Sequence, residues 1–149
     1  MTVTAAITRL GVVAAAATVA LDVRATLIYT APPEQIPAFP ALVIQYASST
    51  FDLFPFGQVP TGQQFEQASV TILYLTSLGT IARAQTAVLA FVDAFRDLIA
   101  ANQNLNGTIR QVRLTRATMG TVDYNGIDYV GAELTLEMDL YHATTWVEA

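Results

Sequence analysis

The Asn125-Gly126 pair, which lies between two β-prone segments, constrains the fold of this 149-residue chain more than any other feature. A type I′ turn requires positive φ at both central residues, and Asn followed by Gly adopts that geometry most readily. The segment after the pair alternates between an apolar side, formed by Ala132, Leu134, Leu136, Met138 and Leu140, and a polar side, formed by Glu133, Thr135, Glu137, Asp139 and Tyr141. We therefore expect an antiparallel hairpin whose second strand has one core face. Its other face either meets water or pairs with the preceding strand.

Three of the seven basic residues, all of which are arginines, gather on the strand predicted before the turn, over Thr108–Met119. Strict alternation places Arg110 and Arg116 on the side of Val112 and places Arg113 on the opposite side. These arginines form the only basic cluster in a chain with twelve acidic residues. We expect them to pair with acidic groups within the sheet or on a neighbouring subunit, where such pairs set register and partner choice.

Two helices and three further strands account for most of the remaining pattern. Apolar residues at helical spacing predict helices over residues 4–21 and 80–101, and Gly107 follows the second in a polar run suited to a turn. Short β-prone segments predict strands over residues 24–30, 41–47 and 65–78. The last of these carries apolar residues on both faces, so we expect it to be central. The order predicts a single α+β domain over residues 1–149, with an antiparallel or mixed sheet and both helices mainly on one face.

The longest apolar run, Leu10–Leu21, has two interpretations. It follows Arg9 and is rich in alanine, as is the hydrophobic region of a signal peptide. We favour a packed helix, whose small side chains let another backbone approach closely. The run is shorter than the roughly 20 residues that a membrane-spanning helix needs, and we expect no membrane partner.

The least regular segment, Ser48–Gln64, is predicted to be a long loop between the second and third strands. Such loops in compact domains are usually functional or disordered. This one carries Phe51, Phe54 and Phe56, and exposed aromatic side chains are unfavourable unless they dock on something. Two possibilities stay open: the loop folds back as a lid on its own core, or it docks on a neighbouring subunit, since aromatics are enriched at interface cores. Trp146, near the C-terminal end, either packs under its own domain or contacts a partner.

The composition favours assembly. Hydrophobic residues make up 53% of the chain and charged residues only 13%, against about 25% charged residues in an ordinary soluble domain. A single domain of this length struggles to bury so much apolar surface, and burial against other protein copies is the simplest solution. With a net charge of −5 and no lysine, the chain is poorly suited to grip DNA phosphates. It would suit a surface that nucleic acid must pass without sticking.

No residue pattern points to catalysis or to a bound cofactor. The chain has no cysteine and a single histidine, His142, which excludes cysteine-based and multi-histidine metal sites. It contains no glycine-rich phosphate loop, no HExxH and no GxSxG. The carboxylates of Glu133, Glu137 and Asp139 are predicted to form a solvated strand face rather than a metal or acid–base site. We therefore expect a non-enzymatic protein that holds neither cofactor nor metal.

Four segments carry a likeness to a known family. They are IYTAPPEQIPAFPALVI, the pair ASVTILYL and IARAQTAVLAFVDAFRDLIAANQ, NQNLNGTIRQVRL, and VDYNGIDYVGAELTLEMDLY. In the order of these elements the chain resembles the tail terminator, or tail completion, proteins of long-tailed bacteriophages. The resemblance covers nearly the whole chain and is architectural, since the family has no catalytic motif to compare.

The resemblance implies a ring of identical subunits, a hexamer, that caps the tail tube protein and ends its polymerisation. The ring would join the tail to the neck or head-closure protein in a virion assembled in the host cytoplasm, with genomic DNA passing through the lumen without sequence-specific binding. The candidate contacts with a neighbouring subunit or partner are Phe51, Phe54, Phe56, Arg110, Arg113, Arg116 and Trp146. The alternatives are another neck or tail structural protein (head-closure, tail-tube or minor tail protein) and a small α+β ligand-binding or enzymatic domain.

Overall fold

The computed structural model describes residues 2–19, 27–30, 32–33, 40–53, 61–76, 81–105, 107 and 109–145. These residues form α1 (Val3–Val19), β1 (Leu27–Tyr29), β2 (Ala41–Leu53), β3 (Thr61–Thr76), α2 (Ile81–Ala101), β4 (Gln111–Tyr124) and β5 (Ile127–Thr145). The strands make one sheet in the order β1-β2-β3-β5-β4. The pair β1 and β2 is parallel, and the other neighbours are antiparallel. The predicted α+β fold with a mixed sheet is confirmed.

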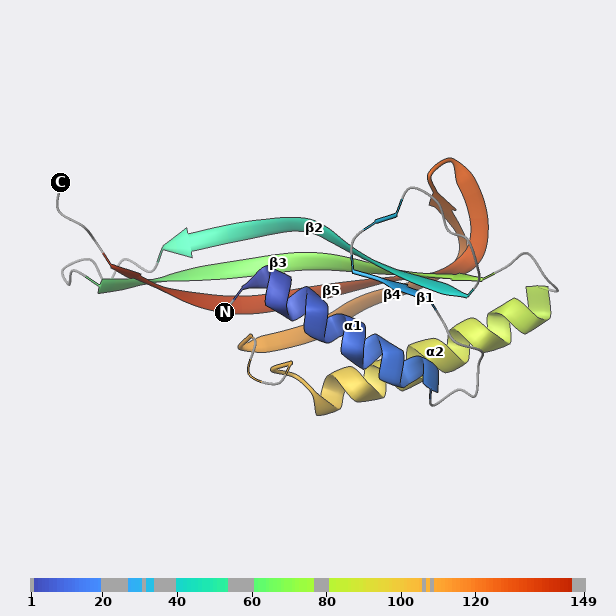
Figure 1. Ribbon diagram of the computed structural model, residues 1–149, viewed down its shortest axis with the longest axis horizontal. Helices are drawn as coiled ribbons and strands as arrows, with labels where there is room; N and C mark the ends of the chain where they lie inside the picture. The colour runs from blue at the N-terminus through green and yellow to red at the C-terminus, as the bar shows by residue number, and fades with distance from the viewer. Residues whose placement is uncertain are drawn as a thin grey trace.

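Both helices lie on the same face of the sheet, as expected (Figure 1). Tyr74 of β3 stacks on Phe91 of α2 with ring centroids 4.6 Å apart, and Phe91 stacks on Phe95 at 5.6 Å. All three side chains are buried. Because truncation of such an aromatic to alanine costs about 3–5 kcal/mol, this stack is a major attachment of α2 to the sheet.

Helix α1 packs into the core of its own subunit. Leu10, Ala14 and Ala17 are fully buried, as their helical spacing predicts. A Cβ atom at Gly11 would lie 3.2 Å from Cγ2 of Thr30, so the missing side chain lets α1 come close to the end of β1. The packed helix that we favour for this apolar run is therefore what the structure contains.

A second, smaller core lies on the opposite face of the sheet, under the β4–β5 hairpin. Asn125 and Gly126 at the hairpin turn have φ values of 56° and 81°, the signs that a type I′ turn requires. The residues before the turn fold over the sheet, where Val122 and Tyr124 pack with Leu73. The C-terminal half of β3 is therefore covered on both faces, which confirms its predicted central position.

A pair of glycines marks the place where this hairpin bends over the sheet. Gly120 of β4 and Gly131 of β5 face each other in the ladder. A Cβ atom at Gly131 would lie 1.9 Å from the carbonyl oxygen of Tyr74, a separation that no side chain can occupy. The two glycines, which we call the glycine corner, thus allow β5 to cross β3 closely while the hairpin turns away from the sheet plane (Figure 1).

Strands β2 and β3 extend further than the sequence predicts. Residues 48–53 pair with residues 64–69, so both ends of the predicted Ser48–Gln64 loop are strand, and only residues 54–60 between them lie outside the described residues. These ends are rich in polar residues and lack the apolar alternation that signals a strand.

Residues 51–53, 61–66 and 140–145 project beyond the helices and beyond the end of β4 as a three-stranded extension, which we call the arm (Figure 1).

Candidate functional site

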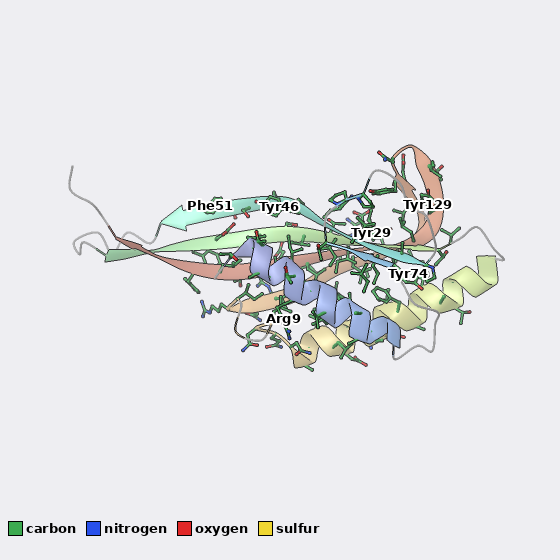
Figure 2. All side chains as sticks on the ribbon, in the orientation of Figure 1. Arg9, Tyr29, Tyr46, Phe51, Tyr74 and Tyr129 are labelled. Carbon is green, nitrogen blue, oxygen red and sulfur yellow. The ribbon has the colours of Figure 1, made fainter. Side chains whose placement is uncertain are left out.

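The surface beside the arm combines exposed aromatic rings with a buried carboxylate. Tyr46 and Phe51 of β2 are 51% and 55% exposed. The Tyr46 hydroxyl donates a hydrogen bond to Ser49 Oγ, and Ser49 Oγ donates to Oε2 of Glu66, each at 2.7 Å. Glu66 is buried and lies opposite Phe51 in the ladder. We call these four residues the arm patch, and its hydrogen-bond chain links the Tyr46 hydroxyl to the Glu66 carboxylate through Ser49. Figure 2 shows Tyr46 and Phe51 along β2.

Phe51 is the part of the predicted aromatic loop that the structure describes, and it is not a lid. Its side chain is exposed on a regular strand, so the alternative in which it folds back on its own core is wrong. Phe54, Phe56 and Trp146 lie outside the described residues, and their roles as contacts stay predictions.

Arg113 meets acidic groups within its own sheet, as predicted. Its Nη2 atom lies 3.4 Å from Oε2 of Glu137 and 3.3 Å from Oδ1 of Asp139. Gln67 donates a further hydrogen bond to the same Glu137 oxygen at 3.3 Å. The Asp139 side chain is only 13% exposed, whereas those of Arg113 and Glu137 are near 40%. The arginine thus offsets part of the charge of two neighbouring carboxylates on the face opposite the helices, which we call the polar face.

The structure corrects the predicted placement of Arg116 and Arg110. A β-bulge just before Arg116 shifts the β4 register, so Arg116 lies opposite Thr135 and on the same side as Arg113. Arg110 precedes β4, and its guanidinium lies 4.8 Å from the centroid of the Tyr141 ring and donates to the Tyr141 hydroxyl. Strict alternation fails at Arg116 because the bulge adds one residue to the strand, and at Arg110 because this residue precedes β4. All three arginines reach the polar face.

The predicted carboxylate face divides into two parts. Glu137 and Asp139 share the Arg113 guanidinium. Glu133 lies further along β5, beneath the hairpin, and in the described part of the chain its carboxylate has no hydrogen-bond or ion-pair partner. Among the described residues, no group of three or more His, Cys, Asp or Glu side chains is placed to hold a metal ion.

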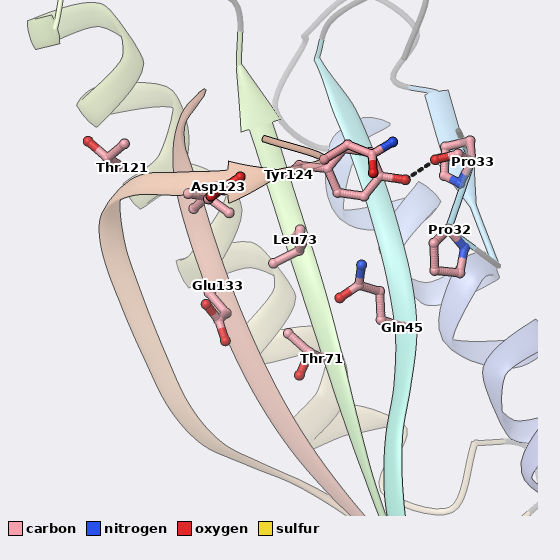
Figure 3. Close-up of a pocket in the computed structure, with 11 residues that line it drawn as sticks. Pro32, Pro33, Gln45, Thr71, Leu73, Thr121, Asp123, Tyr124 and Glu133 are labelled. Atoms are coloured by element: carbon pink, nitrogen blue, oxygen red, sulfur yellow. Dashed lines mark hydrogen bonds between the residues drawn. The ribbon is translucent and has the colours of Figure 1, made fainter. Parts of the chain in front are cut away.

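A pocket of about 630 Å³ opens between the hairpin and the sheet (Figure 3). Its described lining comes from the sheet, the hairpin and the segment after β1: Gln45, Thr71, Leu73 and Glu133, then Thr121, Val122, Asp123, Tyr124 and Asn125, and finally Pro32 and Pro33. Volumes of this size are typical of small-ligand sites. Polar side chains and a few apolar ones therefore share one concave surface on the polar face.

Tyr124 joins two walls of this pocket. Its hydroxyl donates a hydrogen bond to the carbonyl oxygen of Pro33 (Figure 3). Burial, with smaller contributions from Tyr129 and Tyr29, raises the pKa of Tyr124 above its ordinary value of 10.0. The phenol therefore stays protonated at neutral pH and keeps the hairpin connected to the chain that follows β1.

Sequence reasoning missed the glycine corner, the pocket and the arm patch. The glycine corner has a signal in the sequence, because a turn centred on Asn125-Gly126 places residue 120 opposite residue 131. The pocket and the arm patch have no comparable signal. Their residues come from strands that become neighbours only in the folded sheet, such as Tyr46 and Glu66.

Comparison of the chain with known protein families finds no match, and comparison with curated proteins finds none either. Neither helix in the described residues is long and apolar enough to cross a membrane.

Proposed function

We propose that this protein is the subunit of a homo-oligomeric ring that caps the tail tube of a long-tailed phage, ends its polymerisation and joins the tail to the neck. The observation that carries the proposal is the arm. It extends beyond the subunit's own core (Figure 1), and the exposed rings of Tyr46 and Phe51 lie near its base on β2 (Figure 2). These two rings are apolar surface that a single copy does not bury, and exposed apolar patches mark interaction sites.

The edges of the sheet also support a ring. In the described residues, β1 covers only Ala41–Val43 of β2, and the rest of that strand borders the outside of the sheet. Strand β4 forms the opposite edge, with β5 as its partner in the described ladder. The two edges differ in sequence, so contact between them is heterologous, and heterologous contacts generate rings when the rotation closes. Both edges carry bulges, which discourage indiscriminate strand pairing.

Charge supports passage of DNA through such a ring rather than a grip on it. The chain carries a net charge of −5. On the polar face, the Arg113 guanidinium lies between Glu137 and Asp139, so its positive charge is balanced within the subunit. A balanced or acidic lumen offers few counterion-releasing contacts to phosphates, and DNA passes it without being held.

The test has two stages. Light scattering on the purified protein, alone and mixed with tail tubes, measures its oligomeric state. A ring mass of about six copies of the 16.0 kDa chain is expected, and a monomer at high concentration that forms no ring with tubes contradicts the proposal. Tube length in the absence of this protein then identifies its position: overlong tubes indicate a terminator, and tubes of normal length without heads indicate a head-closure or neck protein. A stable monomer that binds a small molecule instead identifies a ligand-binding or enzymatic domain.

A further inference from the structure

The described lining of the pocket under the β4–β5 hairpin includes no residue of the arm and none of the core beneath the helices. The pocket exists because the glycine corner carries the hairpin over the polar face. The sheet forms its floor, with Leu73 and Glu133, and the hairpin and the Pro32–Pro33 segment form its walls. The hydrogen bond from Tyr124 to Pro33 spans the walls, so the pocket is built by tertiary contacts and not by one loop.

The charged side chains among the described residues that line this pocket have one sign. Among its described lining residues, the two charged side chains are the carboxylates of Asp123 and Glu133. One Asp123 oxygen accepts a hydrogen bond from the Gly126 amide at 3.1 Å, which leaves the other oxygen for a ligand. The Glu133 carboxylate has no partner in the described part of the chain. Arg113, further along the sheet, is occupied by Glu137 and Asp139.

The remaining lining narrows the chemistry of the ligand. Gln45 and Thr71 add side-chain oxygens that accept hydrogen bonds, while Leu73 and Val122 provide apolar contact. A ligand that fits this combination is a cation with several N–H donors on an apolar stem. An arginine side chain has this form, since its planar guanidinium has five donors, pairs with carboxylates in a bidentate way and stacks on aromatic rings.

We propose that this pocket binds the guanidinium group of an arginine side chain presented by another polypeptide, with Glu133 as its main ion-pair partner. The carboxylates and the side-chain oxygens accept its N–H donors, and Leu73 with Val122 contacts its methylene stem. A free amino acid fits less well, because it brings an α-carboxylate near the carboxylates of Asp123 and Glu133. The proposal does not depend on ring formation and goes beyond the structural function proposed above.

The test uses the full chain, labelled with ¹⁵N, and N-acetyl-arginine amide as the probe. We expect saturable shifts of the amide signals of residues 121–125, with a dissociation constant in the millimolar range, as suits a single side chain. N-acetyl-citrulline amide, which has the same shape without the charge, should bind at least tenfold more weakly. Free L-arginine should also bind more weakly than the amide.

Two variants complete the test, and each removes one negative charge from the chain. Glu133→Gln should weaken binding of the arginine amide about tenfold, because a charge-assisted pair is lost. Asp128→Asn, which removes a charge from the same hairpin outside the pocket lining, should change the affinity less than twofold. Both side chains are exposed, so both variants should keep the wild-type spectrum.

Absence of saturable binding, equal binding of the citrulline probe, or an unchanged affinity in Glu133→Gln would each overturn the proposal. Free L-arginine binding as tightly as the amide would overturn the polypeptide source of the ligand. Raised salt gives a check that needs no variant: 0.5 M NaCl, on the order of three times physiological ionic strength, should weaken binding of the arginine amide but not of the citrulline probe. If salt weakened binding of both probes equally, that result would also contradict the proposed guanidinium site.

Discussion

At the residue scale, individual side chains on the two faces of the sheet have different roles. Tyr74 on the helix side is buried in a stack of aromatic rings, where its contribution is packing. Arg113 on the polar side is about half exposed, and its contribution is to compensate two carboxylates. The role of Tyr74 depends on exclusion of water, so stability at alkaline pH tests it. The role of Arg113 depends on charge, so the salt dependence of stability tests it.

Burial raises the pKa of Tyr74 above its ordinary value of 10.0. The folded chain therefore keeps this phenol protonated at a pH where the unfolded chain ionises it, and the free energy of unfolding falls as pH rises above about 10. We expect Tyr74→Phe to lose less stability than the wild type between about pH 9 and pH 11, as measured by urea unfolding at each pH. Parallel curves for the two proteins would contradict this expectation.

Arg113→Ala leaves Glu137 and Asp139 close together without their shared cation. We expect a loss of about 1 kcal/mol in unfolding free energy at low salt, the upper end for exposed pairs, and a smaller loss in 1 M NaCl because salt screens the repulsion. The matched control is Arg96→Ala on α2, whose pairs with Asp93 and Asp97 are more exposed. Urea unfolding should show a smaller effect for Arg96→Ala. A loss for Arg113→Ala that does not change with salt would show that lost packing dominates.

At the element scale, the glycine corner decides where the β4–β5 hairpin goes. A straight hairpin would continue the plane of the sheet and leave Leu73 and Leu75 on an open face. The bend instead brings Val122 and Tyr124 over them and creates the second core and the pocket. Gly120 and Gly131 thus let the hairpin cover one face of the sheet, where it forms the pocket, and do not leave it as a flat two-stranded extension.

Gly131→Ala tests this corner. Its Cβ would lie 1.9 Å from a backbone oxygen of β3, and backbone cannot yield as a flexible side chain can. We expect a loss of about 3 kcal/mol or more in unfolding free energy, the upper range for overpacking. Gly107→Ala is the control: it has φ +79° and no atom within 4 Å of the added Cβ, so its cost should be about 1 kcal/mol from backbone conformation alone. Equal losses in thermal or urea unfolding would remove the special role of the corner.

At the scale of the whole molecule, the sheet is longer than the helices that cover it. The helices protect the central part of one face, the hairpin protects one end of the other, and the arm extends past both (Figure 1). The many apolar residues of the chain therefore lie partly in the two cores inside the subunit and partly on the exposed surface beside the arm. Assembly would cover that remaining surface.

Phe51→Ser tests whether the arm patch mediates assembly. Because Phe51 is 55% exposed, its replacement should change the unfolding free energy by no more than about 0.5 kcal/mol. Ring formation, measured by light scattering, should fall strongly. Leu89→Ser on α2, at a similarly exposed apolar position, should leave assembly unchanged. A large fall in melting temperature for Phe51→Ser, or equal effects of the two variants on assembly, would contradict the prediction. We expect the pair Phe54→Ser and Phe56→Ser to reduce assembly in the same way.

Local patterns predicted much of the fold. The turn at Asn125-Gly126, the inward side of β5 and the buried stripe of α2 follow from neighbouring residues alone, and each is confirmed. The predicted alternation along β4 was wrong at Arg116, because the bulge is a property of two paired strands. The predicted loop was too long at both ends, because Ser48–Leu53 becomes a strand through pairing with β3 and not through its own pattern.

The sequence by itself therefore determined the two helices, the hairpin turn and the buried sides of α2 and β5, since spacing along the chain encodes these directly. Only the tertiary structure decided which polar residues meet. Tyr46, Ser49 and Glu66 form one hydrogen-bond chain, and Asp123 and Glu133 line one pocket, although each set comes from separate parts of the chain. The physical reason is that register and bending depend on the packing of whole strands. A single glycine or an inserted residue changes them without altering the local apolar pattern.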